Sequence, residues 1–189
     1  MRLLWSFYLR AMGWTQKGSF PYQFKKAVLI VGPHTSAWDF VMGLAFRSKL
    51  RLQHIKFLGK ESLFKGRFGF FFRKLGGFPV NRSGSNKLVD QVVELFNSHE
   101  EFILALSPEG TRKKVDRLRT GFYHIAKKAG VPIVMVGLDF AHKQGVFSEP
   151  FWPTGDEAAD FTKIYEFYAP LQGKIPEQGM AYFLLSPQP

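Results

Sequence analysis

The sequence contains no cysteine, and this absence excludes several kinds of chemistry. A catalytic thiol, an iron–sulfur cluster and a thiolate zinc site are all impossible, and no disulfide can cross-link the fold. The five histidines are scattered and do not show the spacing of metal ligands. There is also no glycine-rich phosphate loop for ATP and no G-x-S-x-G nucleophile elbow. We therefore expect no metal and no resident cofactor.

The sequence is also poor in acidic residues and in long apolar runs. Fifteen acidic residues stand against 26 basic ones, which gives a formal net charge of +11. No segment supplies the roughly 20 consecutive apolar residues that a membrane-spanning helix needs. A hydrophobic content of 46% in 189 residues is typical of one folded domain, here 1–189. Such a basic domain favours a polyanionic partner.

Positive charge and phenylalanine concentrate between Arg47 and Lys87, where eleven basic residues face one acidic residue, Glu61. The same stretch contains a run of three phenylalanines: Phe70, Phe71 and Phe72. Cations mixed with large apolar side chains suit a bilayer interface, where charged groups pair with lipid phosphates and rings enter the acyl boundary. Two alternatives stay open, because the rings can belong to the core and because such mixtures also suit RNA.

Residues 1–14, MRLLWSFYLRAMGW, have apolar side chains at helical spacing and predict a short amphipathic helix. The side chains that we expect to dock on a membrane are Leu3, Leu4, Trp5, Phe7 and Trp14, together with the three phenylalanines above. The alternative is a helix packed on the domain's own core. Docking predicts a peripheral protein on the cytoplasmic face of a membrane that carries anionic lipids.

Strand-like and helix-like segments alternate in the core region, 27–138. Short apolar runs predict buried strands at 27–32, 55–59, 102–106 and 131–138, with an extended segment at 78–81. Helical periodicity predicts helices at about 36–48, 85–98 and 121–129. Residues 61–75 are predicted to be helical or irregular, and the tail from 141 to form short strands and loops. This pattern predicts an α/β fold, with a mixed, largely parallel central sheet flanked by helices.

The segment PHTSAWDF places His34 directly after a predicted strand and Asp39 five residues later. Residues just past a strand commonly form the active-site rim of α/β folds, and a histidine with a carboxylate makes a base and its orienter. In an ideal helix the two side chains would lie about 140° apart, so they meet only if the chain turns between them. Thr35 or Ser36 would then cap the following helix. Alternatively, Asp39 supports the helix start and His34 is an ordinary loop residue.

The segment SPEGTR follows the predicted strand 102–106 and shares a sheet edge with His34 if the two strands are parallel. Glu109 offers an acceptor and Arg112 a bidentate donor for a polar substrate, and Gly110 lets the backbone approach closely. Upstream, GGFPVNR ends in Arg82, and two converging arginines would make a phosphate site. The alternatives are a surface turn with an internal ion pair and a solvated Arg82.

In this order, the blocks resemble the glycerolipid acyltransferase family, whose best-known members are 1-acylglycerol-3-phosphate acyltransferases. His34 and Asp39 match that family's H-x4-D motif, and residues 108–112 match its P-E-G-T-R block. Residues 77–82 look like the second block, and residues 131–133 resemble the fourth, V-P-I. The resemblance runs from about residue 28 to 136. It departs from the pattern at Pro33, at Ser107, where a phenylalanine is commoner, and around Phe64.

The resemblance implies transfer of a fatty acyl group from acyl-CoA or acyl carrier protein to a lysophospholipid hydroxyl, as in phospholipid biosynthesis. His34 would be the general base and Asp39 would orient it, without an acyl-enzyme. Acceptor binding would fall to Arg82, Glu109, Gly110, Thr111, Arg112 and Lys60. The acceptor would be 1-acylglycerol-3-phosphate or, alternatively, a lyso-aminolipid. An esterase and a basic RNA-binding module are the rival functions, although no nucleic-acid partner is expected.

Overall fold

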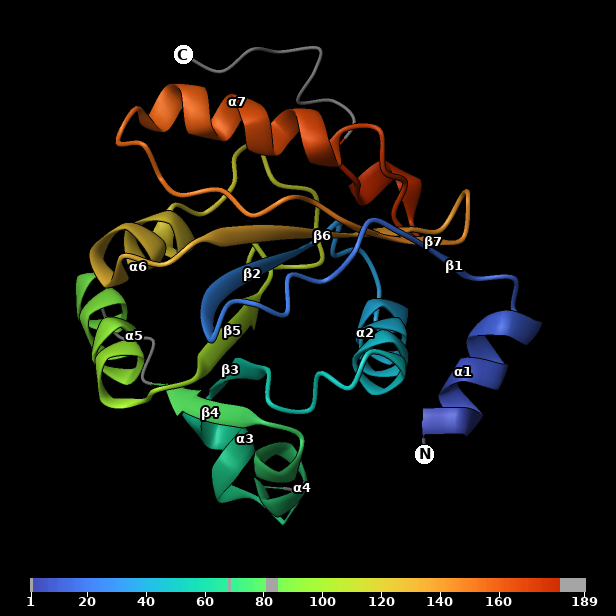
Figure 1. The fold of residues 1–189 in the computed structure, drawn as a ribbon, viewed down its shortest axis with the longest axis horizontal. Coiled ribbons are helices and arrows are strands. Elements are labelled where there is room, and N and C mark those ends of the chain that lie inside the picture. Colours follow the sequence, from blue (N-terminus) through green and yellow to red (C-terminus); the bar gives the residue numbers. More distant parts are fainter. Residues whose placement is uncertain (1, 68, 81–84, 181–189) are drawn as a thin grey trace.

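The computed structural model describes residues 2–67, 69–80 and 85–180. Its centre is a seven-stranded sheet in the order β1-β7-β6-β2-β5-β3-β4 (Figure 1). In chain order the strands are β1 (Thr15–Lys17), β2 (Lys26–Gly32), β3 (Lys56–Lys60), β4 (Gly77–Val80), β5 (Phe102–Leu106), β6 (Ile133–Asp139) and β7 (Gln144–Phe147). The pair β6–β7 is antiparallel and the other pairs are parallel, so the predicted mixed, largely parallel sheet is confirmed.

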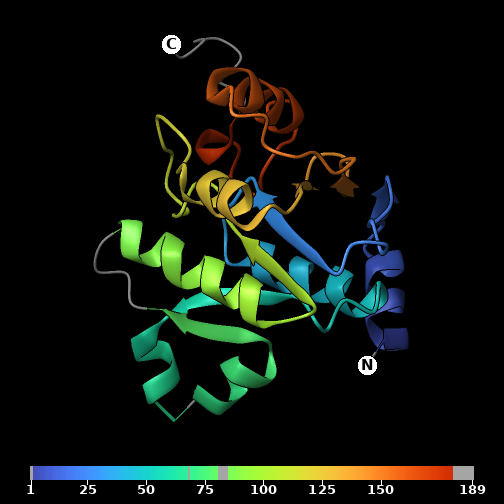
Figure 2. The same cartoon turned by 60° about the vertical axis from the view of Figure 1, so that its left-hand side comes forward.

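Helices cover both faces of this sheet, as predicted (Figures 1 and 2). They are α1 (Arg2–Ala11), α2 (Trp38–Lys49), α3 (Glu61–Lys65), α4 (Gly69–Lys74), α5 (Ser85–Ser98), α6 (Gly121–Ala129) and α7 (Glu157–Tyr168), followed by a 3-10 turn at Pro176–Gln178. Because side chains alternate along a strand, Val28 and Ile30 of β2 pack with α5, α6 and α7. Ala27 and Leu29 enter the core of the opposite face. On that face α1 and α2 form a third apolar cluster with Leu138 of β6.

The parallel register brings the ends of the two motif-bearing strands together. Strand β2 pairs with β5 from Lys26–Phe102 to Ile30–Leu106, and it pairs with β6 up to Gly32–Gly137. The carboxyl ends of all three strands therefore lie at one edge of the sheet. The segments after β2 and β5, which carry His34 and Glu109, leave the sheet side by side, as the sequence predicted for parallel strands.

The tail contains the expected short strand, β7, but it also contains the helix α7 where only loops and strands were expected, so that part of the prediction was wrong. Asp156 caps α7 by accepting a hydrogen bond from the backbone N–H of Ala159 at 3.1 Å. The helix buries Phe161, Ile164 and Tyr168, which recur at helical spacing. The prolines that suggested irregular structure fall outside the helix and do not interrupt it.

The N-terminal segment is helical, but only part of it is open to solvent. Trp14 is 7% exposed and packs edge to face against Phe46 and Phe140, with ring centroids 6.0 and 5.0 Å away. Its expected place on a membrane is therefore corrected, because its indole belongs to the core between α1 and α2. Trp5 is half-buried in the same cluster.

The other side chains expected at a membrane are largely exposed. Leu3, Leu4 and Phe7 on α1 lie open to solvent, and so do Phe70 and Phe71 on α4. Phe72 is half-buried, and its ring lies 6.3 Å from that of Phe64, so it contributes mainly to packing. None of the helices within the described ranges has the length and hydropathy needed to cross a bilayer.

Candidate active site

His34 and Asp39 meet across a turn, which was the condition that the sequence analysis set for their contact. The His34 Nδ1 atom lies 3.1 Å from Asp39 Oδ2, and the imidazole is 26% exposed while the carboxylate is 4% exposed. A carboxylate on Nδ1 favours the tautomer with its proton there, which leaves Nε2 as a base. The structure gives Nε2 no hydrogen-bond partner among the described residues, so this atom is available to a substrate hydroxyl.

Asp39 also organises the chain between the two residues. Its Oδ2 atom accepts hydrogen bonds from the backbone N–H groups of Thr35 at 2.7 Å and Ser36 at 2.8 Å. The residue directly before α2 is Ala37, which makes no side-chain cap, and Thr35 does not cap the helix. The Ser36 hydroxyl accepts from the backbone N–H of Trp38, the first residue of α2, at 3.3 Å, so Ser36 does serve the helix start as the sequence suggested. The turn thus forms around the carboxylate of Asp39, and its Oδ1 atom is buried without a partner among the described groups.

Glu109 fixes the same loop from the neighbouring strand. The backbone N–H of His34 donates to both carboxylate oxygens of Glu109, at 3.0 and 2.8 Å, and the Ser107 hydroxyl donates to Oε2 at 3.1 Å. The Glu109 side chain is 1% exposed. The expectation that Glu109 contacts the substrate is therefore corrected: its carboxylate is buried and used inside the protein, where it positions His34.

Burial has a large electrostatic effect on Glu109. Loss of water raises the pKa of this carboxyl from 4.5 to about 7, against the opposing effect of its hydrogen bonds from His34 and Ser107. The ionised form suits its two donors, because a carboxylate only accepts hydrogen bonds. Proton uptake near neutral pH would therefore weaken the connection between the two loops.

A segment that the sequence analysis did not single out closes the site from the other side. The hydroxyl of Thr35 accepts a hydrogen bond from the backbone N–H of Ile175 at 3.1 Å. Gly173 packs so closely on Thr35 that a β-carbon at this glycine would lie 2.5 Å from the threonine methyl group. Tyr168, at the end of α7, donates its hydroxyl to the carbonyl of Ile30. No local sequence signal marked these contacts, since they join residues more than 130 positions apart.

The loop after β5 carries the remaining predicted substrate residues that the structure describes. Gly110 adopts a φ of +68°, a conformation that favours glycine, and the Arg119 N–H donates to the Pro108 carbonyl at 2.8 Å to close the loop. Arg112 is exposed, and the Thr111 hydroxyl, which is half-buried, accepts from the N–H of Lys113. The loop that contacts His34 through Glu109 therefore also carries the exposed Arg112.

Two further predicted substrate residues are placed only in part. Lys60 ends β3, and its register partner Val80 ends β4, so both strands finish toward the edge that carries the histidine loop. The Lys60 side chain and Arg82 lie outside the described parts of the structure. The predicted meeting of Arg82 and Arg112 therefore stays a prediction.

An apolar hollow of about 310 Å³ borders the histidine loop. Its lining comes from α1, α2, the β6–β7 turn and the segment after α7: Tyr8, Met12, Trp14, Trp38, Met42, Phe140, Lys143, Gln172, Gly173, Lys174 and Pro176. Trp38 precedes Asp39, and Gly173 touches Thr35, so the hollow starts at the loop that bears the base. Lys143 and Lys174 supply its positive charge. Such a hollow suits an apolar chain attached to an anionic group.

Comparison with known proteins identifies the family of this chain. A family model described as acyltransferase matches residues 15–139, which include the histidine loop and the loop after β5. A 1-acyl-sn-glycerol-3-phosphate acyltransferase from Streptococcus pneumoniae (strain ATCC BAA-255 / R6) is 33% identical over 110 residues. That alignment covers 57% of this chain and 40% of the relative, so less than half of the relative is matched. The chain belongs to the acyltransferase family, as the resemblance of its motifs predicted.

Proposed function

We propose that this protein transfers a fatty acyl group from a thioester to the hydroxyl of a lysophospholipid such as 1-acylglycerol-3-phosphate, as a step of phospholipid biosynthesis. One observation carries the proposal: the Asp39-held imidazole of His34 keeps Nε2 open at a sheet edge that also bears the cationic loop 107–120. The name of the S. pneumoniae relative supports the choice of acceptor.

The reaction uses His34 first as a base and then as an acid. Its Nε2 atom takes the proton of the acceptor hydroxyl while that oxygen attacks the thioester carbonyl. The tetrahedral intermediate collapses, the carbon–sulfur bond breaks, and the imidazolium returns the proton to the departing thiolate. The Asp39 carboxylate stabilises the transient imidazolium, and no acyl-enzyme forms.

Arg112 is the proposed ligand of the acceptor's phosphate, because its guanidinium is exposed on the loop that follows Glu109. Gly110 and Thr111 would line the path of the glycerol, and Lys60 and Arg82 would complete the phosphate site. Glu109 is not included among these acceptor ligands, because its carboxylate accepts from the backbone N–H of His34 and positions that residue.

The donor would place its acyl chain in the apolar hollow beside Trp38. Lys143 and Lys174 at this hollow suit the phosphates of acyl-CoA or the phosphopantetheine of acyl carrier protein. Lys143 has a φ of +52°, an unusual conformation for a lysine that is often found at functional positions.

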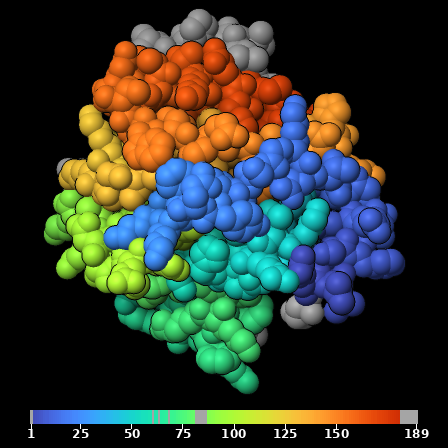
Figure 3. Space-filling model, viewed as in Figure 1, coloured from blue at the N-terminus to red at the C-terminus, as the bar shows by residue number. Residues whose placement is uncertain are grey.

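Membrane attachment would be peripheral, on the cytoplasmic face and on anionic lipids. The exposed Leu3, Leu4 and Phe7 would enter the bilayer surface together with Phe70 and Phe71. Helix α4 and the start of α1 both lie toward the end of the molecule opposite α7 in two views (Figures 1 and 2). In the space-filling view α1 forms one side and α3–α4 the lower tip, which supports a shared docking region (Figure 3).

An acyl-transfer assay tests the proposed function. The purified chain is offered a panel of lyso-lipids, including 1-acylglycerol-3-phosphate and a lyso-aminolipid, with acyl-CoA and with acyl carrier protein thioesters, and products are identified by mass. We expect a diacyl product in proportion to thiol release. Free fatty acid in place of that product would indicate an esterase, and salt-sensitive RNA binding without transfer would favour the RNA-binding alternative.

A further inference from the structure

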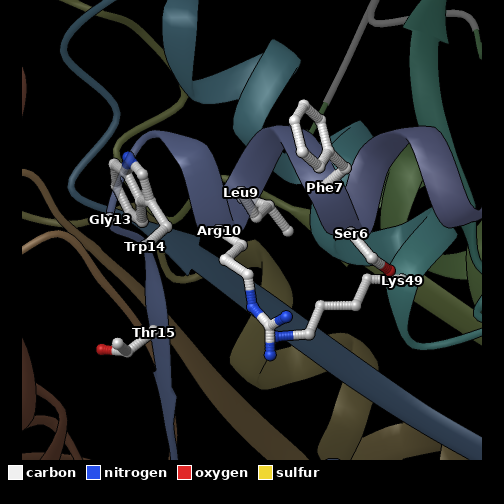
Figure 4. A pocket seen from close by; sticks show the side chains of 8 residues that line it. All are labelled: Ser6, Phe7, Leu9, Arg10, Gly13, Trp14, Thr15 and Lys49. Carbon is white, nitrogen blue, oxygen red and sulfur yellow. The ribbon is translucent and has the colours of Figure 1, made fainter.

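A second pocket, of about 550 Å³, lies between α1, the start of β1 and the end of α2. Its lining residues are Ser6, Phe7, Leu9, Arg10, Gly13, Trp14, Thr15 and Lys49 (Figure 4). Leu9 and Trp14 form a buried apolar floor, whereas Arg10 and Lys49 bring two cations to the wall. The pocket shares Trp14 with the hollow beside the histidine loop but none of that hollow's lysines.

The two cations converge without a counter-ion from the described chain. Figure 4 shows the guanidinium of Arg10 and the ammonium of Lys49 turned toward the same part of the pocket. No carboxylate lines it, and the Nε atom of Arg2 donates to the Lys49 carbonyl at 3.3 Å, which adds a third cation nearby. Convergent like charges repel each other, and an anion between them removes this cost.

The pocket also lies where the headgroups of a bilayer would be. At 100° per residue, Arg2, Ser6 and Arg10 form one stripe of α1, between the buried Leu9 and the exposed Leu3 and Phe7. If the exposed apolar side chains enter the acyl boundary, this stripe stands at the depth of the lipid phosphates. Ser6 of this stripe and Thr15 also line the pocket, although the Thr15 hydroxyl points away from the two cations (Figure 4).

We propose that this pocket binds the phosphate of an anionic membrane phospholipid, with Arg10 and Lys49 as its two cationic ligands. The inference rests on the membrane attachment in the proposed function. It adds a defined binding site for one lipid headgroup to the general attraction between a basic protein and an anionic membrane. Binding there would fix the rotation of α1 on the membrane. Because α2 begins at the histidine loop, it would also set the height of His34 above the surface.

Vesicle co-sedimentation with charge-matched variants tests the site. The full chain and the variants Arg10→Gln, Lys49→Gln and the double variant are partitioned onto phosphatidylcholine vesicles that contain a fixed fraction of phosphatidylglycerol. Lys17→Gln is the control, because Lys17 is an exposed cation outside the pocket. A general charge effect lowers partitioning about fivefold per cation removed. Thermal unfolding verifies that all variants are folded.

We expect Arg10→Gln and Lys49→Gln each to reduce partitioning onto the anionic vesicles by well over fivefold. The double variant should reduce it little more than either single variant, because both side chains bind the same phosphate. The proposal would be overturned if each pocket variant reduced partitioning only as much as Lys17→Gln does, and if the two reductions added in the double variant. Release of the wild type from vesicles by inorganic phosphate at constant ionic strength would support the proposal, because free phosphate competes with the lipid phosphate for the same two cations.

Acyl transfer to a water-soluble short-chain acceptor separates this inference from the proposed function. Arg10→Gln and Lys49→Gln should keep wild-type transfer on that acceptor, because neither residue belongs to the proposed catalytic or substrate sites. Loss of transfer in these variants would place the pocket in acceptor binding and overturn the headgroup role. A wild type that transfers acyl groups but ignores anionic vesicles would overturn the headgroup site and leave the proposed chemistry standing.

Discussion

The backbone N–H of His34 lies 3.0 and 2.8 Å from the two carboxylate oxygens of Glu109, a residue 75 positions further along the chain. This hydrogen bond joins the loop after β2 to the loop after β5 at the shared edge of the sheet. It fixes the main chain of His34, while Asp39 fixes the ring. The imidazole is therefore held from two directions by two buried carboxyl groups.

The first prediction concerns the base and its orienter. His34→Ala should abolish acyl transfer. Asp39→Asn should lower kcat on the order of 10⁴-fold, because an amide facing Nδ1 favours the wrong tautomer. Asp39→Asn should also cost some stability, since Oδ2 accepts from the N–H groups of Thr35 and Ser36. Steady-state kinetics on folded protein checks both variants, and near-normal turnover by His34→Ala would remove the mechanism.

The second prediction concerns pH. Since the pKa of Glu109 is raised from 4.5 to about 7, the folded protein keeps a proton there that the unfolded chain has lost. Stability should therefore decrease as pH rises from 4.5 to 7, and this group alone contributes about 3 kcal/mol of the change. Denaturant unfolding of wild type and Glu109→Gln across this range measures it. The difference between the unfolding free energies of the wild type and Glu109→Gln should change with pH. A difference that stays constant across this range would contradict the raised pKa of Glu109.

The third prediction separates the two substrates. Arg112→Ala should raise the KM for the lysophospholipid by about tenfold or more and change the thioester KM little, because a bidentate charged contact to phosphate is lost. Lys113→Ala is the matched control, an exposed neighbouring cation that the sequence motif does not include. Equal effects on both substrates, or equal effects of both variants, would count against a phosphate site at Arg112.

The fourth prediction tests the apolar hollow as the acyl site. Met12→Trp narrows the hollow from its exposed side and should slow transfer from long-chain donors more than from short-chain ones. Ala11→Trp adds the same ring at an exposed neighbour that does not line the hollow. Competition assays with mixed long-chain and short-chain acyl-CoA give the ratio of the two transfer rates directly. An unchanged ratio in Met12→Trp would exclude the hollow as the chain's path.

The fifth prediction concerns the apolar face of α1. Leu3→Ser and Leu4→Ser should each weaken partitioning onto anionic vesicles about tenfold while leaving thermal unfolding unchanged, because both side chains are exposed. Leu9→Ser should instead destabilise the fold, since Leu9 is buried. Deleting residues 1–14 would be a poor test, because it removes Leu9 and Trp14 from the core. Unchanged partitioning of the first two variants would contradict docking through this face.

Local pattern was sufficient to predict strands β2 to β6 and several helices, but it did not mark the edge strand β1. The apolar runs at β2, β5 and β6 and the periodicity of α5 and α6 come directly from burial on a strand or a helix face. The motif spacing showed that His34 and Asp39 can meet only across a turn, and the structure contains that turn. Helix α7 escaped prediction although Phe161, Ile164 and Tyr168 recur at helical spacing, because the prolines on both sides of it suggested irregular structure.

The sequence by itself determined which chemistry is present: one histidine with a carboxylate, a cationic loop, and no thiol. Only the tertiary structure decided that Glu109 serves His34, that Trp14 belongs to the core and that the segment after α7 closes the site. The reason is physical. Whether a polar or aromatic side chain meets water or protein depends on contacts between residues far apart in the chain, and the parallel register of β2 and β5 creates those contacts.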